Sequence, residues 1–349
     1  MSFSIGIIGL PNVGKSTLFK ALTQQEVDIS NYPFCTIDPN IGIVQVPDQR
    51  LKKISELIQP KKTTPTAIEF VDIAGLVKKA HKGEGLGNQF LAHIREVNAV
   101  IHVIRSFKDK DIKHIEDTLD IQRDIEITET ELIMKDIETL EKHLNKIEGD
   151  IKARDKQALK EKQLIEKLQQ HLNQGKPISD TTLTGEEIKI IKHLSLLTIK
   201  PMIYLINSKG TDDELEAIKA LPQNTIPLDL KLELEMSELS EQEKQELNLE
   251  SRLDVLIKTC YKILNLITFY TIKGGEETRA WTAEENTKAP EAGGIVHTDF
   301  QEKFIRAEVI NYKDLIQSKT WKQAKTEGKI RTEGKEYTIK DGDILEFKI

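Results

Sequence analysis

The sequence predicts an α/β fold in which a parallel sheet covered by helices is interrupted by an antiparallel helical arm and followed by a small α+β domain. Three observations support this prediction. Strand and helix signals alternate over the first hundred residues, a glycine-rich turn joins the first strand to the first helix, and a long charged helical region separates two groups of strands. The alternation favours a parallel sheet because each parallel connection needs a crossover, usually a helix.

Composition narrows the class of protein. The chain has 349 residues, enough for two or three domains, with 38% hydrophobic and 31% charged residues. A formal net charge of −7 gives no general attraction to nucleic acid, and no apolar run approaches the ~18 residues of a membrane span. The N-terminal stretch MSFSIGIIGL lacks the charge and length of a secretory signal, and the two cysteines, Cys35 and Cys260, make no metal or disulfide framework. We therefore expect a cytoplasmic protein.

The strands and helices of the main domain follow from short β-branched runs. The stretches SIGIIGL, GIVQV, AIEFVDI and NAVIHVI predict strands, and helical patterns cover about residues 15–22 and 86–96. Two further runs, PMIYLI and TIPLDL, come after residue 200 and predict that the sheet is completed there. The residues between the two groups of strands therefore form an insertion.

The insertion has the pattern of a coiled coil. From about residue 124 onward, apolar residues recur at steps of three and four between charged residues. They are Ile133, Ile137, Leu140, Leu144, Ile147 and Ile151 in a first helix and Ile165, Leu168 and Leu172 in a second helix over about residues 155–173. We expect a hairpin of two antiparallel helices that turns between Gly149 and Asp155. A buried pair of bundle helices is the alternative, but so many charged residues favour an exposed arm.

The chain changes character again near Ile267, where short strands and glycines replace the helical pattern. Two alternating runs on either side of Asp341 and Gly342 predict a terminal β-hairpin. The predicted organisation has four segments: residues 1–123 and 199–266 for the two parts of the main domain, 124–198 for the arm, and 267–349 for the small domain.

The glycine-rich turn matches a phosphate-binding loop, or P-loop. GLPNVGKST, from Gly9 to Thr17, fits G-x-x-x-x-G-K-[ST] and lies between a predicted strand and a predicted helix. Its backbone N–H groups can surround phosphates at the positive end of the helix, Lys15 can reach the β- and γ-phosphates, and Ser16 can bind Mg²⁺. The expected nucleotide-binding residues of the loop are Asn12, Val13, Gly14, Lys15, Ser16 and Thr17.

Two other segments supply the rest of this site. In FVDIAG, Asp72 ends an apolar strand, where it can hold Mg²⁺, and the N–H of Gly75 can reach the γ-phosphate. Thr36, in YPFCTIDPN, is expected to bind the metal through its hydroxyl. Leu76 stands where many GTPases have the glutamine that orients the attacking water, so catalytic help must come from elsewhere.

The chain resembles the YchF family, the Obg-like ATPases, over nearly its full length. The resemblance rests on GLPNVGKSTLF, NYPFCTIDPN, DIAGLVK, HKGEGLGNQFL, RAWT and HTDFQEKFIRAEV, which occur in the family's order. It implies a G domain with an inserted helical arm and a C-terminal TGS domain, which has a β-grasp fold. It also implies Mg²⁺-dependent ATP hydrolysis and contact with ribosomes.

The resemblance also implies roles for single residues. A hydrophobic residue at the position of Leu76 is a family feature, and Asn12 matches a P-loop asparagine that looks like the K⁺ ligand in cation-activated relatives. A K⁺ ion there could supply the positive charge that an arginine finger supplies in other enzymes. His114, in KDIKHIED, matches a loop histidine thought to assist catalysis. Together with Lys15 and Gly75 it makes up the expected catalytic set.

The base-binding segment departs from the family pattern. The strand PMIYLI continues into NSKG, from Asn207 to Gly210, where the family has Asn-x-x-Glu, and Asp229-Leu230 replaces a Ser-Ala pair common in the last loop of a G domain. An acidic side chain at position 210 would accept the N1–H and 2-amino groups of guanine, which Gly210 cannot do. The amide of Asn207 can pair with N6 and N7 of adenine. We expect ATP to bind about tenfold more tightly than GTP.

These observations favour a ribosome-associated ATPase that acts as a nucleotide-dependent switch in translation. The expected partners are ATP, the large ribosomal subunit and ribosomal RNA, with no membrane and a monomeric chain. The run WKQAKTEGKIR at Trp321 is either a phosphate contact or a solvated helix face. Two alternatives remain open, a GTPase of translation or ribosome assembly and a nearly inactive nucleotide sensor. The intact phosphate and Mg²⁺ residues favour an enzyme, whereas Leu76 and Gly210 favour the sensor.

Overall fold

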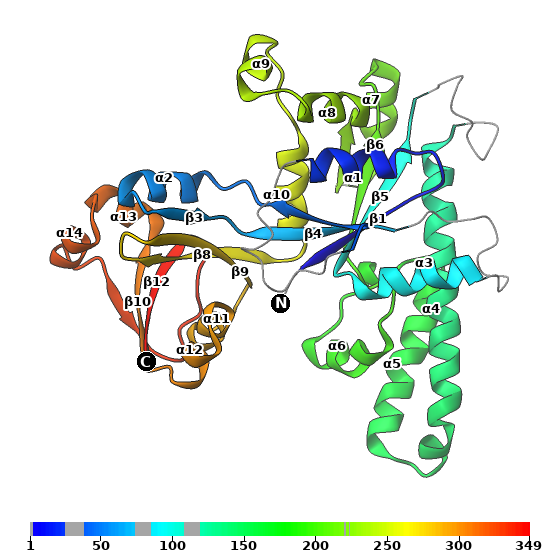
Figure 1. Ribbon diagram of the computed structural model, residues 1–349. Coiled ribbons are helices and arrows are strands. Elements are labelled where there is room, and N and C mark those ends of the chain that lie inside the picture. The colour runs from blue at the N-terminus through cyan, green and yellow to red at the C-terminus, as the bar shows by residue number, and fades with distance from the viewer. Residues whose placement is uncertain (1–2, 25–37, 74–84, 108–118, 220, 223) are drawn as a thin grey trace.

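The computed structural model describes residues 3–24, 38–73, 85–107, 119–219, 221–222 and 224–349, and these contain two six-stranded sheets (Figure 1). The first sheet has the order β2-β4-β1-β5-β6-β7. Its strands are β1 (Ser4–Ile8), β2 (Ile41–Gln45), β4 (Ala67–Asp72), β5 (Ala99–Arg105), β6 (Met202–Asn207) and β7 (Thr225–Leu228). Each of the predicted strands of the main domain is present.

The first sheet is mixed, which corrects the prediction of a parallel sheet. All neighbouring strands are parallel except β2, which runs antiparallel to β4 with Ile43 opposite Glu69. The helix between these two strands, α2 (Gln49–Ile58), does not cross the first sheet, because it packs on the second sheet. The chain therefore returns through β4, which lies beside β2 and runs in the opposite direction.

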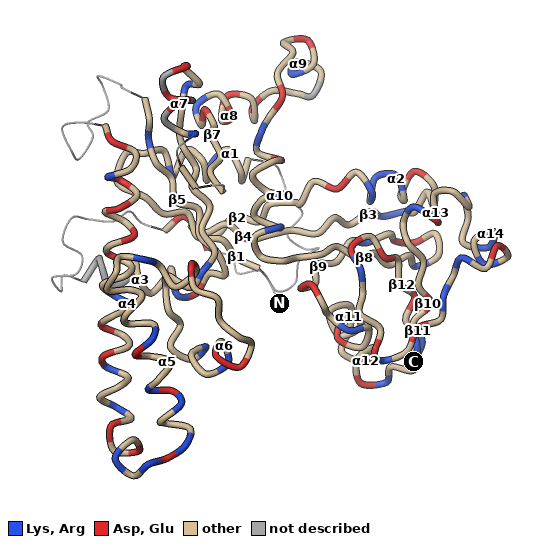
Figure 2. The backbone as a smooth tube through the Cα atoms, turned by 180° about the vertical axis from the view of Figure 1, so that it is seen from behind, with Lys and Arg blue, Asp and Glu red and all other residues tan. Residues whose placement is uncertain are grey.

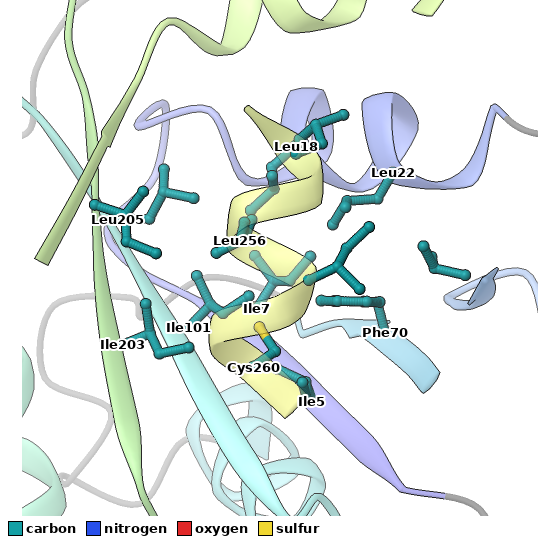
Figure 3. Packing of buried hydrophobic residues seen from close by; sticks show 14 of the residues in the cluster. Ile5, Ile7, Leu18, Leu22, Phe70, Ile101, Ile203, Leu205, Leu256 and Cys260 are labelled. Atoms are coloured by element: carbon teal, nitrogen blue, oxygen red, sulfur yellow. The ribbon is translucent and has the colours of Figure 1, made fainter. Parts of the chain in front are cut away.

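Helices cover both faces of the first sheet. On one face, Leu256 and Cys260 of α10 pack among Ile5, Ile7 and Ile101, and α1 completes this core (Figure 3). On the other face, α3 and the first turns of α4 form a second cluster. The helices of this part are α1 (Lys15–Thr23), α3 (Gly85–Glu96), α4 (Ile121–Lys152), α5 (Lys156–Leu172), α6 (Gly185–Ile191), α7 (Asp212–Lys219), α8 (Leu230–Ser237), α9 (Glu241–Glu246) and α10 (Leu253–Ile263), with the 3-10 helices η3 (Ile178–Asp180) and η4 (Lys192–Leu194).

Between β5 and β6 the chain forms a pair of long helices, α4 and α5, which extend away from the first sheet (Figure 1). α4 ends at Lys152, and α5 begins after Asp155, whose carboxylate accepts the N–H groups of Gln157 and Ala158. Their apolar residues pack together and against α6 and η4, and charged residues occur along the length of both helices (Figure 2). Within the described ranges, no helix has the length and apolar character needed to cross a bilayer.

A buried carboxylate fastens α4 to the segment that leads back to the sheet. Asp136 is fully buried, and its two oxygens accept the N–H of Leu197 at 2.8 Å, the N–H of Thr198 at 2.8 Å and the hydroxyl of Thr198 at 2.7 Å. These donors have lost their contact with water, so each needs an acceptor inside the protein. Asp136 therefore fixes where the helical pair leaves the domain.

The second sheet draws one strand and one helix from the first hundred residues. Its order is β11-β10-β12-β8-β9-β3, and β3 pairs parallel to β9. Leu51 and Ile54 of α2 pack against Tyr270 and Ile310 of the second sheet, so residues 49–64, which the sequence assigns to the main domain, belong to this layer. The elements are β3 (Lys62–Thr64), β8 (Leu266–Lys273), β9 (Glu277–Glu284), β10 (Arg306–Asn311), β11 (Arg331–Glu333) and β12 (Asp343–Lys348), with helices α11 (Ala289–Val296), α12 (Thr298–Glu302), α13 (Tyr312–Ser318) and α14 (Trp321–Thr326).

The predicted terminal hairpin is wrong. Gly342 has φ 89° and the N–H of Asp343 donates to the carbonyl of Lys340, so the turn exists. The run before it forms an isolated bridge, between Thr338 and Lys288, instead of a strand beside β12. The reason is that β12 lies inside the sheet, where β10 and β8 already occupy both of its edges.

We predict that Asp136→Ala lowers the free energy of unfolding by about 3 kcal/mol or more, because it leaves the buried N–H groups of Leu197 and Thr198 without acceptors. Urea denaturation followed by circular dichroism measures this loss. Glu138→Ala is the matched control, since that carboxylate lies on the same helix, is 43% exposed and pairs with lysines of its own helix. It should cost less than about 1 kcal/mol. Equal losses in the two variants would contradict the anchoring role of Asp136.

Candidate nucleotide-binding site

Two glycines let the P-loop close between β1 and α1. Gly9 has φ 146° and Gly14 has φ 111°, a region that favours glycine. A Cβ atom on Gly9 would overlap the carbonyl oxygen of Val103, and one on Gly14 would lie 2.6 Å from Nδ2 of Asn207. No described side chain caps the start of α1, so the N–H groups of its first turn are available to an anion.

Lys15 is the cation of this loop. Its Nζ donates to the carbonyl oxygens of Gly9 at 3.1 Å and Leu10 at 2.9 Å. Burial lowers the pKa of Lys15, and the negative charge of Asp72 acts in the opposite direction. Both hydrogen-bond acceptors are neutral carbonyls, so an anionic ligand in the loop would give the half-buried ammonium a stronger partner.

The hydroxyl of Ser16 meets the carboxylate of Asp72 beside the loop. Ser16 Oγ donates to Asp72 Oδ2 at 3.1 Å. Asp72 ends β4, where the parallel register sets it opposite Ile7, two residues before Gly9. Adjacent ligands of an octahedral Mg²⁺ ion with bonds of about 2.1 Å lie about 3 Å apart. These two oxygens therefore fit one Mg²⁺ ion without rearrangement of the backbone.

Under the loop, β5 contributes a neutral histidine that no sequence motif indicated. His102 is fully buried, and its Nε2 lies 3.0 Å from the hydroxyl of Thr128. That hydroxyl donates to the carbonyl of Asp124, so we assign the ring proton to Nε2. Burial, with a smaller contribution from Lys15, lowers the pKa of His102 to about 3. The imidazole therefore adds no positive charge beneath Lys15 at neutral pH.

Asn207 holds the P-loop. It ends β6, is 7% exposed, and donates through Nδ2 to the carbonyl of Val13 at 2.9 Å. Its Oδ1 accepts the N–H of Leu230, the first residue of α8, at 3.3 Å. Each end of the amide makes one bond to the protein and keeps a second donor or acceptor position, so the pairing with N6 and N7 of adenine stays a prediction. We assign Asn207 a positioning role, which its place at a strand end did not reveal.

The turn after Asn207 leaves space beside Gly210. Gly210 has φ 77°, its N–H donates to Ser208 Oγ at 2.9 Å, and that hydroxyl donates to Glu214 at 2.7 Å. A Cβ atom on Gly210 would meet no described atom within 4 Å. Nζ of Lys209 lies 4.9 Å from the centre of the Phe107 ring, a cation–π contact that the sequence did not indicate.

The other predicted residues divide into two groups. Asn12 is exposed with φ 64°, and Thr17 is half-buried on α1. The side chain of Val13 is buried in the core, and its carbonyl accepts the bond from Asn207. Three predicted site residues, Thr36, Gly75 and His114, lie outside the described part of the chain, as do Cys35 and Leu76.

A P-loop that closes onto a helix N-terminus, with a lysine, a hydroxyl and a carboxylate gathered beside it, defines the class of P-loop nucleoside triphosphatases. A family model described as a 50S ribosome-binding GTPase matches residues 4–170, and the model YchF-GTPase_C, described as a protein of unknown function, matches residues 266–349. The chain belongs to the YchF family.

The relatives match the whole chain. The Ribosome-binding ATPase YchF of Bacillus subtilis is 47% identical over 364 residues, which cover 100% of this chain and 99% of that protein. The protein of the same description from Escherichia coli O157:H7 is 43% identical over 360 residues, 99% of each chain. The solved structure of the Schizosaccharomyces pombe YchF GTPase has a TM-score of 0.88 at 39% identity and covers 99% of this chain and 98% of its own.

We predict that Asn207→Ala weakens ATP and GTP binding by the same factor, about tenfold, because the lost bonds position the loop that both nucleotides share. Titration of fluorescent analogues of both nucleotides measures the two affinities. Ser208→Ala is the neighbouring control, since it leaves the bonds to Val13 and Leu230 in place and should change neither affinity by as much. A loss confined to ATP would show that Asn207 reads adenine after all.

Proposed function

We propose that this protein is a ribosome-associated ATPase that hydrolyses ATP, and GTP less well, to the nucleoside diphosphate and phosphate in the cytoplasm. Its nucleotide state would switch its action in translation. The observation that carries the proposal is the gathering of Lys15, Ser16 and Asp72 at one loop, with Ser16 and Asp72 only 3.1 Å apart. The relatives described as ribosome-binding ATPases support the same reading.

In this proposal the loop binds the phosphates. The backbone N–H groups from Val13 to Thr17 surround the β-phosphate at the positive end of α1. Lys15 exchanges its two carbonyl acceptors for oxygens of the β- and γ-phosphates, and these charge-assisted bonds are stronger than the ones they replace. Asn207 keeps the loop in place during this exchange.

Ser16 and Asp72 would hold Mg²⁺, and Thr36 is proposed as a further ligand. When bound, Mg²⁺ neutralises the charge that develops on the β- and γ-phosphate oxygens. The separation of the Ser16 and Asp72 oxygens supports this pair. The N–H of Gly75 is proposed to bind the γ-phosphate.

Catalytic assistance is proposed to come from a second cation and a loop histidine. Leu76 has no polar group to orient the attacking water, so positive charge near the phosphates has to come from another source. Asn12 is exposed on the loop and carries an amide oxygen suited to K⁺. His114 is proposed to assist proton transfer or water positioning.

The choice of base is proposed to follow from Gly210. Guanine presents N1–H and a 2-amino group, and this position has no side-chain acceptor for either donor. Adenine lacks both donors and loses nothing here. We therefore propose that ATP binds about tenfold more tightly than GTP, a difference of roughly 1.4 kcal/mol.

The ribosome is proposed as the partner of a monomeric chain, with the large subunit and its RNA as the contact. The family description as a 50S ribosome-binding GTPase supports this choice. We propose that α4 and α5 act as a coiled-coil arm within residues 124–198, between main-domain segments 1–123 and 199–266. Residues 267–349 are proposed to form a TGS domain of the β-grasp type, whose sheet is extended by β3 and covered in part by α2.

The basic run near α14 gives little support to an RNA contact. Lys325 lies 3.9 Å from Glu308, and Lys329 lies 2.9 Å from Glu327. Arg331 pairs with a glutamate of its own strand at 3.2 Å. These pairs neutralise much of the positive charge of the run. The docking surface is proposed to lie on the helical arm and on the C-terminal domain of residues 267–349.

Phosphate release with saturating Mg·ATP, with and without ribosomes, tests the function. We predict slow release by the protein alone, faster release with ribosomes, and slower release with GTP. Lys15→Ala should abolish release, because that lysine alone in the loop can reach the β- and γ-phosphates. Lys20→Ala, on the same helix but exposed, is the matched control and should behave like the unaltered protein.

Each contrary outcome selects another function. Faster turnover of GTP than of ATP would identify a translation or ribosome-assembly GTPase, and tight binding without release would identify a nucleotide sensor. Near-normal release by Lys15→Ala would remove the basis of the site assignment. Failure to pellet with ribosomes in both the ATP-analogue and ADP states would refute the proposed partner.

The role of Asn12 leads to a prediction about salts. Replacing KCl by NaCl at equal ionic strength should slow ATP turnover, because Na⁺ is smaller than the ion that the proposed site binds. Asn12→Ala should turn over slowly in both salts and lose the difference between them. Equal rates of the unaltered protein in KCl and NaCl would rule out K⁺ as a cofactor.

A further inference from the structure

Three potential metal ligands converge on the helical arm, on elements that carry no part of the nucleotide site. They are His143 of α4, Glu161 of α5 and His193 of η4. His143 Nε2 lies 2.9 Å from Glu161 Oε1, and His193 Nε2 lies 3.6 Å from the same oxygen. The two imidazole rings are 4.9 Å apart between centroids.

The spacing suits a single small ion. One ligand atom from each of the three residues lies within 4.8 Å of the others. Ligands at about 2.05 Å from a tetrahedral Zn²⁺ ion are about 3.3 Å apart. The two separations from the Glu161 oxygen, 2.9 and 3.6 Å, lie on either side of that value. Small side-chain rotations would therefore bring all three atoms to bonding distance.

A metal ion could reach the cluster of His143, Glu161 and His193 from solvent. The side chains of His143 and Glu161 are each 13% exposed, whereas that of His193 is 54% exposed. Two ligands are thus held in a sheltered position, and the third faces solvent, from which an ion can enter. The ion pairs of Glu161 within the described residues are with these two histidines, so no lysine or arginine competes with a cation for the carboxylate.

We propose that His143, Glu161 and His193 bind one divalent transition-metal ion, Zn²⁺ in the first place, with water in the fourth position. Two imidazole nitrogens and one carboxylate suit Zn²⁺, whereas Mg²⁺ prefers oxygen ligands alone. The ligands come from three separate elements, so the ion ties α4, α5 and η4 together. The site is thus a metal clamp on the arm and is distinct from the Mg²⁺ site of the P-loop.

The full-length, nucleotide-free protein, stripped of metal with a chelator, is titrated with Zn²⁺ by calorimetry. Millimolar Mg²⁺ is present so that hard-ion sites are already filled. We expect one Zn²⁺ per chain and a higher melting temperature with Zn²⁺. His193→Ala and Glu161→Gln should each weaken binding at least tenfold, as removal of a metal ligand does. Bound Co²⁺ should give visible absorption of a four-coordinate site, which His193→Ala should abolish.

His297→Ala is the matched control. His297 is 63% exposed and lies 3.7 Å from a carboxylate oxygen of Asp299, so it reproduces a histidine–carboxylate pair without a second histidine. It should leave Zn²⁺ binding unchanged. His193 is exposed, so its substitution should leave the fold intact, and an unchanged far-ultraviolet spectrum checks this. Absence of saturable 1:1 binding, or equal binding by the unaltered protein and His193→Ala, would overturn the proposal.

Discussion

The amide of Asn207 is the contact on which the rest of the site depends. It joins the end of β6 to the P-loop at Val13 and to the start of α8 at Leu230. The same amide fills the space where residue 14 would carry a Cβ atom, so a close backbone approach and a glycine are needed together. The loop that this amide holds also carries Lys15, whose Nζ donates to the carbonyls of Gly9 and Leu10.

Local patterns predicted most of the main domain. The strands follow from runs of β-branched residues, and the start of α1 follows from the P-loop motif, which places its lysine and serine at the beginning of a helix. Lys15, Ser16 and Asp72 could therefore be named from sequence. The pairing of elements that lie far apart in the sequence could not be predicted. The pairing of β3 with β9 joins Thr64 to Arg279 across more than two hundred residues, and neither segment carries a signal of the other.

The same distinction applies to Asn207 and to the second sheet. The place of Asn207 at a strand end was predicted from sequence, whereas its bonds to the P-loop and to α8 depend on how closely these elements approach. The turn at Gly342 is correct as a turn, whereas the partners of β12 are set by strands from other parts of the chain. A local motif therefore predicts the chemistry of a site more reliably than it predicts which distant residues contact that site.

A crystal structure with Mg²⁺ and a non-hydrolysable ATP analogue is the decisive measurement for the P-loop site. We predict that Lys15 leaves the carbonyls of Gly9 and Leu10 for the β- and γ-phosphates, and that Ser16 and Asp72 flank the metal. The Asn207 amide should stay bonded to Val13. An Asn207 side chain bonded to the base and detached from Val13, or a Lys15 still on the loop carbonyls, would contradict this prediction.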